Sequence, residues 1–305
     1  MNTINVCVAC DDNYSKYAGV VIASILKNAK ETDKLSIYIL DGGVSEERKQ
    51  EILSLKSIKD CEILFVSVDE TLYEEYKKVK TLEHISFATY YRLKLPSMLP
   101  NVNRIIYLDC DMVVLTSLEE LFNTDIGENY IAGCEDLGVK KLFNKYKNYV
   151  NAGMLLFDLD KMRKENIEKK FLDCTIKNIN NLKHSDQDII NYTCKGHIYI
   201  LDEKWNVQSS NFTNRSSYTN EPKIIHFIAS RKPWIWASFS YHRDLYFKYL
   251  QVTPWALSEE EYKHWTKDNQ IASLIEYVKY RPLFLLRPRF YIALFATYIK
   301  PFLKN

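Results

Sequence analysis

The sequence lacks three features that would point at once to a class of function: a large net charge, paired metal-type cysteines and a long apolar run. Its 41 Lys and Arg nearly balance its 39 Asp and Glu, so we expect no nucleic-acid partner. Of the seven cysteines, only Cys7 and Cys10 have C-x-x-C spacing, and both fall within one predicted buried strand. We interpret them as small hydrophobic residues of a protein in a reducing cytoplasm, not as a zinc or redox motif.

The missing apolar run bears on the location of the protein. From Met1 the chain enters a strand pattern without a basic start or an apolar core, so we expect no signal peptide and a cytoplasmic protein. The apolar runs near the C-terminus are shorter than the about 20 residues that a membrane-spanning helix needs. With 47% hydrophobic and 26% charged residues, the chain of 305 residues is expected to form a globular fold, neither disordered nor fibrous.

Apolar runs of strand length alternate with segments of helical periodicity in the first part of the chain. Strands are predicted at residues 5–10, 35–40 and 61–68, and helices at 14–29 and 45–55. This alternation is typical of βαβ units, so we predict an α/β fold with a mostly parallel central sheet flanked by helices. In such sheets, ligands bind beyond the carboxyl ends of the strands.

An apolar strand pattern at residues 105–108 is followed by two acids in alternate positions, Asp109 and Asp111. Side chains two apart on an extended chain point to the same side, so both carboxylates can face one point. Like charges placed in this way repel each other unless a cation lies between them, usually a divalent ion with oxygen ligands. Two solvated loop acids are the alternative, and the pair alone does not decide between the two.

Arg92 lies inside an otherwise apolar helical pattern, residues 83–95, which Pro96 is expected to end. A partly buried arginine needs an acid or a phosphate as partner, because an unpaired buried cation is costly. A plain surface arginine is the alternative. Further on, Asn151 and Gly153 begin a predicted strand at 150–157, where glycine permits close approach of the backbone to a ligand or a neighbour.

Three later features complete the pattern. Ser185 is expected to cap a helix whose first turn is acidic, which by itself is an ordinary helix start. The polar stretch 205–221 predicts a loop, and a loop of that length within a compact domain is more often functional than accidental. His226 ends a short strand and is followed within six residues by Arg231 and Lys232, which favours an anionic ligand nearby; a structural histidine is the alternative.

Seven motifs in this order resemble the retaining glycosyltransferases of family 8, most nearly the bacterial lipooligosaccharide galactosyltransferases, with galactinol synthases and glycogenin more distant. The resemblance covers roughly residues 4–236. It implies a single Rossmann-like, nucleotide-sugar-binding domain of the GT-A type at 1–240, followed by a helical extension at 241–305. The motifs are Asp11-Asp12-Asn13-Tyr14, His84-Ile85-Ser86, Arg92-Leu93-Lys94-Leu95, Tyr107-Leu108-Asp109-Cys110-Asp111, Asn151-Ala152-Gly153, Asp186-Gln187-Asp188, and His226 with Lys232-Pro233-Trp234.

The resemblance implies metal-dependent transfer of glucose or galactose from a UDP-sugar to a glycan or glycolipid acceptor. Asp109, Asp111 and His226 match the family's metal ligands, and the oxygen-rich set suits Mn²⁺, with Mg²⁺ as the alternative. Ala229 departs from the family by standing where a glycine is common near the diphosphate. The positions implied to hold the UDP-sugar and its metal are Ala9, Asp11, Asn13, Tyr14, Arg92, Asp109, Cys110, Asp111, Asn151, Ala152, Asp188 and Lys232.

Two further positions are implied to be catalytic. Asp186 matches a residue that contacts the sugar, and Gln187 matches the position discussed as a nucleophile in a double displacement. A covalent intermediate calls for a carboxylate beneath the anomeric carbon, and an amide is a poor nucleophile. We therefore favour a front-face mechanism in which an oxygen of UDP takes the acceptor proton while Gln187 shields the oxocarbenium-like charge.

Two other classes of protein remain as alternatives. A haloacid-dehalogenase-like phosphatase also carries an apolar strand ending in Asp-x-Asp, but that motif normally ends the first strand, and three predicted strands precede it here. A non-catalytic nucleotide- or glycan-binding module would keep the fold without needing Asp109, Asp111 and His226 together.

The tail at 277–305 is basic and contains no acid. Cations interleaved with short aromatic and aliphatic runs favour peripheral contact with an anionic membrane, here the inner face of the cell membrane. A C-terminal helix docked on the protein core is the alternative. The basic residues are Lys279, Arg281, Arg287, Arg289, Lys300 and Lys304.

Overall fold

The computed structural model describes residues 3–79, 86–142, 148–208, 221–228, 232–237 and 242–269, with Ala272 and Tyr291 alone beyond them. Within these residues, no helix combines the length and the apolar character needed to cross a membrane. Several sequence predictions lie outside the described residues. These are the predictions on His84, Ile85, Ala229 and Arg231, on most of the stretch 205–221 and on nearly all of the tail 277–305.

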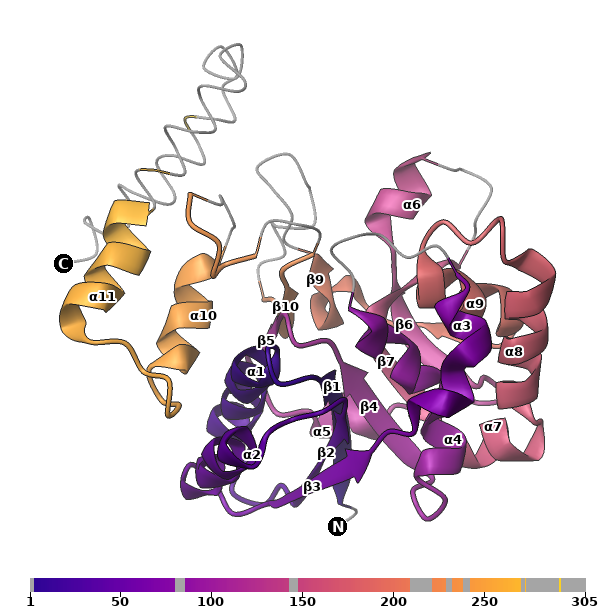
Figure 1. Cartoon of the computed structure of the whole chain (residues 1–305), viewed down its shortest axis with the longest axis horizontal. Coiled ribbons are helices and arrows are strands. Elements are labelled where there is room, and N and C mark those ends of the chain that lie inside the picture. The colour runs from indigo at the N-terminus through magenta and orange to yellow at the C-terminus, as the bar shows by residue number, and fades with distance from the viewer. Residues whose placement is uncertain are drawn as a thin grey trace.

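A seven-stranded sheet forms the centre of the protein, with the strand order β3-β2-β1-β4-β7-β6-β8 (Figure 1). Neighbouring strands run parallel except at β7, which is antiparallel to β4 and β6. The prediction of an α/β fold with a mostly parallel sheet is therefore confirmed. The strands are β1 (Ile4–Cys10), β2 (Leu35–Asp41), β3 (Glu62–Ser67), β4 (Arg104–Leu108), β6 (Ile131–Glu135), β7 (Val150–Asp158) and β8 (Ile198–Ile200).

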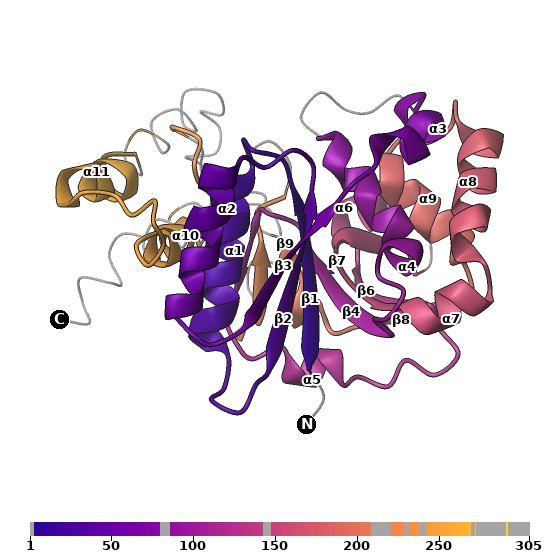
Figure 2. The ribbon, with the colours of Figure 1, turned by 60° about the horizontal axis from the view of Figure 1, so that its bottom comes forward.

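Helices cover both faces of this sheet (Figure 2). Successive residues of β1 point to opposite faces, so Val6 and Val8 join the core beneath α1 and α2, whereas Cys7 and Ala9 join the core on the other side. Strands buried on both faces are apolar throughout, as the run at 105–108 predicts. The first layer holds α1 (Ser15–Asn28), α2 (Glu46–Leu53) and α5 (Glu119–Phe122); the second holds α3 (Glu74–Lys77), α4 (Leu95–Met98), α7 (Leu159–Lys164), α8 (Ile167–Asn178) and α9 (Ser185–Thr193).

One edge of the sheet collects polar side chains. The strands β1, β4 and β6 run in the same direction, so their carboxyl ends meet there, and the antiparallel β7 brings its amino end to the same edge. Asp11, Asp109 and Asp136 follow β1, β4 and β6, and Asn151 is the second residue of β7. Four separate segments of the chain thus deliver polar groups to one place, where ligands bind in folds of this class.

A second, three-stranded sheet lies beside the first and has the order β5-β10-β9. Its strands are β5 (Met112–Val114), β10 (Ile224–His226) and β9 (Val207–Gln208). β10 runs antiparallel to β5, which places His226 opposite Met112 and next to Asp111. The polar stretch 205–221 is therefore not entirely a loop, because Val207 and Gln208 form a strand against β10.

The described part of the C-terminal region packs against α1 and the small sheet (Figure 1). Phe247 and Leu250 of α10 join Val20, Val113 and Ile225 in a third hydrophobic cluster. The division into domains at residue 240 stays a prediction. The remaining helices are α6 (Leu137–Leu142), α10 (Arg243–Leu250), α11 (Glu259–Lys263), a π-helical turn (His264–Asp268) and the 3-10 helices η1 (Ser54–Ser57), η2 (Glu70–Tyr73), η3 (Phe87–Lys94) and η4 (Glu203–Trp205).

Pro96 does not end the helical segment around Arg92. Residues Phe87–Lys94 form a 3-10 helix capped by Ser86, and α4 follows at once with Pro96 in its first turn. The first turn of a helix does not need the backbone N–H that proline lacks, so proline is tolerated there. Between α7 and α8 the chain turns at Asn166, which adopts a left-handed conformation with φ 52°.

Two serines lie at helix starts, and only one of them caps its helix. Ser45 caps α2 by accepting from the backbone N–H of Arg48. Ser185 is not a cap, because it is itself the first residue of α9 and has φ 51°. Instead, Asp188 accepts from the backbone N–H groups of Lys183 and His184, at 2.6 and 2.8 Å. A carboxylate one turn into the helix thus holds the two residues that precede it.

Candidate active site

A pocket opens at the polar edge of the large sheet. It lies between the turn after β1, the 3-10 helix that carries Arg92, the acid pair after β4, and the segment that follows β10. Most of the residues singled out from the sequence for ligand binding line it. The lining residues are Ala9, Cys10, Asp11, Tyr14, Ser86, Ala88, Thr89, Arg92, Tyr107, Asp109, Cys110, Asp111, Asn151, His226, Ile228 and Lys232.

Asp109, Asp111 and His226 form a group that could hold a metal ion. Each offers one ligand atom, and the three atoms lie within 4.8 Å of one another. The Oδ1 atom of Asp111 is buried and accepts no hydrogen bond within the described part of the chain, while Nε2 of His226 lies 3.2 Å from it. Two carboxylates and one imidazole, without a thiolate, suit Mn²⁺ or Mg²⁺ better than Zn²⁺. The residues present therefore fit a divalent cation.

Gly153 gives this group its room. A Cβ atom at position 153 would overlap Cε1 of His226 and lie 2.8 Å from Oδ2 of Asp109. The backbone of β7 also fixes the first acid, because the N–H of Asp109 donates to the carbonyl oxygen of Gly153 at 2.8 Å. The glycine expected to permit close approach thus lies directly behind two of the three candidate ligands.

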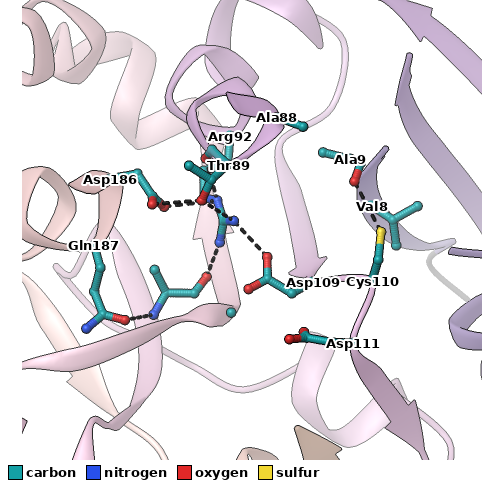
Figure 3. A network of polar contacts seen from close by, with 12 residues as sticks. Val8, Ala9, Ala88, Thr89, Arg92, Asp109, Cys110, Asp111, Asp186 and Gln187 are labelled. Atoms are coloured by element: carbon teal, nitrogen blue, oxygen red, sulfur yellow. Dashed lines mark hydrogen bonds and ion pairs between the residues drawn. The ribbon is translucent and has the colours of Figure 1, made fainter. Parts of the chain in front are cut away.

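Arg92 is buried and pairs with acids, as its place in an apolar pattern predicts. Its guanidinium donates to Asp109 at 2.7 Å and lies 3.3 Å from Asp186, and only 2% of its surface is exposed (Figure 3). It also donates to the carbonyl oxygen of Ala152 and stacks over the Tyr107 ring at 4.1 Å. One cation thus holds two carboxylates from distant parts of the chain.

The two carboxylates around Arg92 are strongly desolvated. Burial raises the pKa of Asp186 to about 6, although Arg92 and the hydroxyl of Thr89, which donates at 2.7 Å, both lower it. Burial likewise raises the pKa of Asp109, against the effect of Arg92. In each case, loss of water disfavours the charged form more than the nearby arginine favours it.

Asp111 is in a different electrostatic environment from Asp109. The ammonium of Lys232 donates to Oδ2 of Asp111 and, at 2.8 Å, to the carbonyl oxygen of Phe227. Burial alone would raise the pKa of Asp111, but the ammonium of Lys232 holds that pKa well below its usual range. Asp111 is therefore ionised at neutral pH, as a carboxylate ligand of a metal must be.

Gln187 is held at both ends of its amide. Its Oε1 accepts from the backbone N–H of Ala152 at 3.0 Å (Figure 3), and its Nε2 donates to Asp136 at 3.1 Å. The side chain of Asn151 donates to the same two residues, at 3.1 Å to Asp136 and 3.3 Å to Gln187. Asp136 therefore orients both amides at the inner end of the site.

Several predicted site residues lie outside the pocket lining. Asn13 is exposed in the turn after β1, while Ala152, Asp186 and Gln187 lie behind the lining and contact it through Arg92 and Asn151. The carboxylate of Asp188 is turned away into the core, where it accepts from the hydroxyl of Tyr149 at 2.6 Å and from the backbone N–H of Lys183 just before α9. The assignment of Asp188 to ligand binding stays a prediction. The structure shows in addition that its carboxylate holds Tyr149 and the segment before α9.

Sequence reasoning missed some of the residues that the structure brings together. Thr89 lies one helical turn before Arg92, a spacing that could have revealed it. Asp136 follows a strand that ends at the same edge as Asp11 and Asp109, so the rule that selected those two acids could have selected it as well. Asn206, which contacts His226, carried no such signal in its polar surroundings.

Comparisons with known proteins agree with this geometry. The family model for glycosyl transferase family 8 matches residues 5–236. A putative glycosyltransferase of Haemophilus influenzae is 36% identical over 212 residues, which are 67% of this chain and 63% of that protein. A lipopolysaccharide 1,2-glucosyltransferase of Escherichia coli is 28% identical over 307 residues, covering 93% of this chain and 88% of that protein.

A solved structure adds the likeness in fold. The galactosyltransferase LgtC, solved in complex with donor and acceptor sugar analogs, superposes with a TM-score of 0.73 at 26% identity. The alignment covers 84% of this chain and 98% of that one. The GT-A arrangement implied by the sequence motifs is thereby confirmed, with a large central sheet between helical layers.

Proposed function

Because the chain belongs to glycosyl transferase family 8, we propose that this retaining glycosyltransferase moves glucose or galactose from a UDP-sugar to a glycan or glycolipid acceptor. The observation that carries the proposal is the convergence of Asp109, Asp111 and His226 within 4.8 Å at a pocket that also contains Lys232. The lipopolysaccharide glucosyltransferase and galactosyltransferase among the relatives support a role in cell-surface glycan synthesis.

Asp109, Asp111 and His226 would hold Mn²⁺, with Mg²⁺ as the alternative. When bound, such an ion offsets the charge that grows on the departing UDP. Lys232 lies beside Asp111 and brings a positive charge to the same place, where it would bind the diphosphate directly.

The other end of the pocket suits the uridine. Asp11 accepts from the backbone N–H of Tyr14 at 2.9 Å, which fixes the turn after β1. The Tyr14 ring meets Tyr17 edge-on, and Tyr17 stacks on Trp234 with ring centroids 3.9 Å apart. A tyrosine supported in this way would present its face to a base with little loss of side-chain freedom.

The reacting sugar would lie near Arg92, Asn151 and Gln187. The amide of Gln187 is held by Ala152 and Asp136, so it is preorganised and is not positioned as a free nucleophile. This supports the front-face mechanism, in which an oxygen of UDP takes the acceptor proton and Gln187 shields the positive charge that develops on the sugar ring. Near-normal turnover of a Gln187→Ala variant would remove Gln187 from any essential role.

Calorimetry tests the proposal most directly. UDP is titrated into the protein with and without Mn²⁺, and inorganic phosphate is titrated in parallel. We expect UDP binding that depends on Mn²⁺ and is lost in Asp111→Asn and His226→Ala, but is kept in Asp160→Asn, which removes an exposed carboxylate paired with Lys164. Binding of phosphate but not of UDP would favour the phosphatase alternative, although the acid pair here follows β4 and not the first strand.

Hydrolysis assays then separate an enzyme from a binding module. A panel of UDP-sugars is incubated with the protein and Mn²⁺, and release of UDP is measured. We expect slow hydrolysis of UDP-glucose or UDP-galactose, with the preferred one identifying the donor. Tight UDP binding without turnover of any sugar nucleotide would point to the non-catalytic module.

We also propose that the tail at 277–305 holds the enzyme at the cytoplasmic face of the membrane, near a lipid-linked acceptor. Its six cations and absence of acids support this placement. Co-sedimentation with vesicles that contain anionic lipid tests the idea, with neutral vesicles as the control. We expect the full chain to sediment only with the anionic vesicles, and a chain ending at Glu276 to stay in the supernatant. Sedimentation of the shortened chain would contradict this.

A further inference from the structure

We infer that Asn206 is a positioning residue that presents Nε2 of His226 to the metal site by fixing the tautomer of the imidazole. The inference rests on the proposed role of His226 as a metal ligand, and it assigns a role to a residue that does not line the pocket. Asn206 is 2% exposed and His226 is 4% exposed, so both side chains depend on protein partners. Oδ1 of Asn206 lies 3.1 Å from Nδ1 of His226.

The orientation of these amides follows from the backbone. The N–H of Gly153 donates to Oδ1 of Asn151 at 3.1 Å, so that atom must be the amide oxygen. The Nδ2 atom of Asn206 lies 3.0 Å from the same oxygen and must therefore be a donor. The remaining amide atom of Asn206, which faces His226, is then the oxygen. Each step is fixed by the one before it, and the first is a main-chain N–H.

An amide oxygen can only accept a hydrogen bond, so Nδ1 of His226 must carry a proton. In the neutral imidazole this leaves the lone pair on Nε2, the atom that lies 3.2 Å from Oδ1 of Asp111. A metal-binding histidine needs its second ring nitrogen held in this way, because the partner sets both the tautomer and the direction of the ring. Asn206 supplies that partner.

The backbone holds Asn206 and His226 in register. Asn206 lies between the 3-10 helix η4 and β9, and its N–H donates to the carbonyl oxygen of Glu203 at 3.1 Å. β9 pairs with β10 so that Gln208 is opposite His226. Asn206 therefore directly precedes the strand that is hydrogen-bonded to the strand of His226, which leaves little freedom for either side chain to turn.

The same amides reach the other end of the site. Asn151 donates to Asp136 and Gln187, so hydrogen bonds run without a break from the candidate metal ligand His226 through Asn206 and Asn151 to Gln187. A change at Asn206 should therefore alter the metal site first and the orientation of Asn151 second. If Asn206 only stabilised the fold, its replacement would not be expected to change the metal site before the orientation of Asn151.

The test combines a spectroscopic signature with metal binding. Long-range ¹H–¹⁵N spectra of the ¹⁵N-histidine-labelled full chain, free of metal and at mildly alkaline pH, report which ring nitrogen of each neutral imidazole carries the proton. We expect the His226 signals, assigned by their loss in His226→Ala, to show protonated Nδ1 and unprotonated Nε2. The affinity for Mn²⁺ alone is measured by calorimetry.

In Asn206→Ala we expect the Nδ1–H tautomer to be no longer dominant and the affinity for Mn²⁺ to fall about 10- to 100-fold. Asn206→Asp keeps an acceptor for Nδ1–H, so the tautomer should be restored, with an affinity nearer that of the wild type. Asn28→Ala is the matched control, because Asn28 donates to Ser24, Val114 and Tyr249 away from the pocket. It should leave both readouts unchanged.

Two results would overturn the inference. One is a proton on Nε2 and not on Nδ1 in the wild-type chain. The other is an Asn206→Ala variant that binds Mn²⁺ as the wild type does while His226→Ala does not bind it. If His226→Ala itself kept full affinity for Mn²⁺, the proposed metal role of His226 would fail instead. The metal-free spectra would then still report on the contact with Asn206.

Discussion

The Nε2 atom of His226 lies 3.2 Å from Oδ1 of Asp111, although 115 positions separate the two residues along the chain. β10 pairs antiparallel with β5, and the N–H of Phe227 donates to the carbonyl oxygen of Asp111 at 2.9 Å. The small sheet is therefore the element that assembles the candidate metal site. It brings β10, from late in the chain, beside the acid pair that follows β4.

Gly153→Ala should damage this site although it replaces none of the proposed ligands. The added methyl group would overlap the His226 ring and approach Oδ2 of Asp109. We expect the affinity for Mn²⁺ to fall at least about 10-fold, by analogy with the loss of residues that orient metal ligands. Gly196→Ala serves as the control, because position 196 has a strained φ of 87° but open space around it. Equal Mn²⁺ binding in the two variants would contradict the expectation.

Arg92→Ala should destabilise the fold in the absence of metal. The change leaves Asp109 and Asp186 without their shared cation, and breaking a buried ion pair in this way costs on the order of 3 to 5 kcal/mol. Urea unfolding monitored by circular dichroism measures the loss. Arg92→Lys should lose less, because it keeps the charge and gives up the forked geometry. Lys30→Ala removes an exposed pair with Glu119 and should shift the midpoint little.

The pH dependence of stability should change in Asp186→Asn. Burial raises the pKa of Asp186 to about 6 in the folded chain, above the ordinary value of about 3.9 for an unfolded chain. The folded state therefore holds the proton more tightly, and this group costs stability as the pH rises from about 4 to about 6. Asparagine does not ionise, so the variant should gain on the wild type across that window, by on the order of 2 to 3 kcal/mol in total. Unfolding free energies of both proteins from pH 4 to pH 8 provide the measurement, and a constant difference would contradict the sign.

Lys232→Met should separate nucleotide binding from metal binding. The Lys232 ammonium pairs with Asp111 and is proposed to bind the diphosphate, so its loss should weaken UDP binding about 10-fold or more. Binding of Mn²⁺ alone should not weaken, because the variant keeps all three proposed metal ligands. It also lacks the ammonium that competes with the metal for Asp111. Calorimetry with each ligand measures both effects. Lys223→Met, which removes a cation paired with Glu120 at the surface, should change neither.

Local pattern was sufficient for much of the fold. The apolar runs at 5–10, 35–40 and 105–108 predict buried strands because burial on both faces requires apolar residues throughout. The two-residue spacing of Asp109 and Asp111 predicts a shared direction, and the apolar neighbours of Arg92 predict an acidic partner. Each of these inferences depends only on residues close together in the chain.

Capping and turn details were less predictable. Ser185 is of a residue type that often caps helices, but it is the first residue of α9, and Asp188 accepts from the two backbone N–H groups that precede the helix. Proline often ends a helix, but a new helix begins one residue before Pro96. Several side chains can satisfy the same backbone groups, and the surrounding packing selects among them.

The sequence by itself determined the α/β alternation, the acid pair after the central strand and the order of the family's motifs, because these follow from periodicity and spacing along the chain. Only the tertiary structure decided that His226 meets Asp111, that Asp136 orients Gln187 and that Asn206 faces the imidazole. Those contacts depend on the pairing of β5 with β10 and on the direction of buried amides. Both are set by long-range packing and hydrogen bonding, which local residue pattern does not encode.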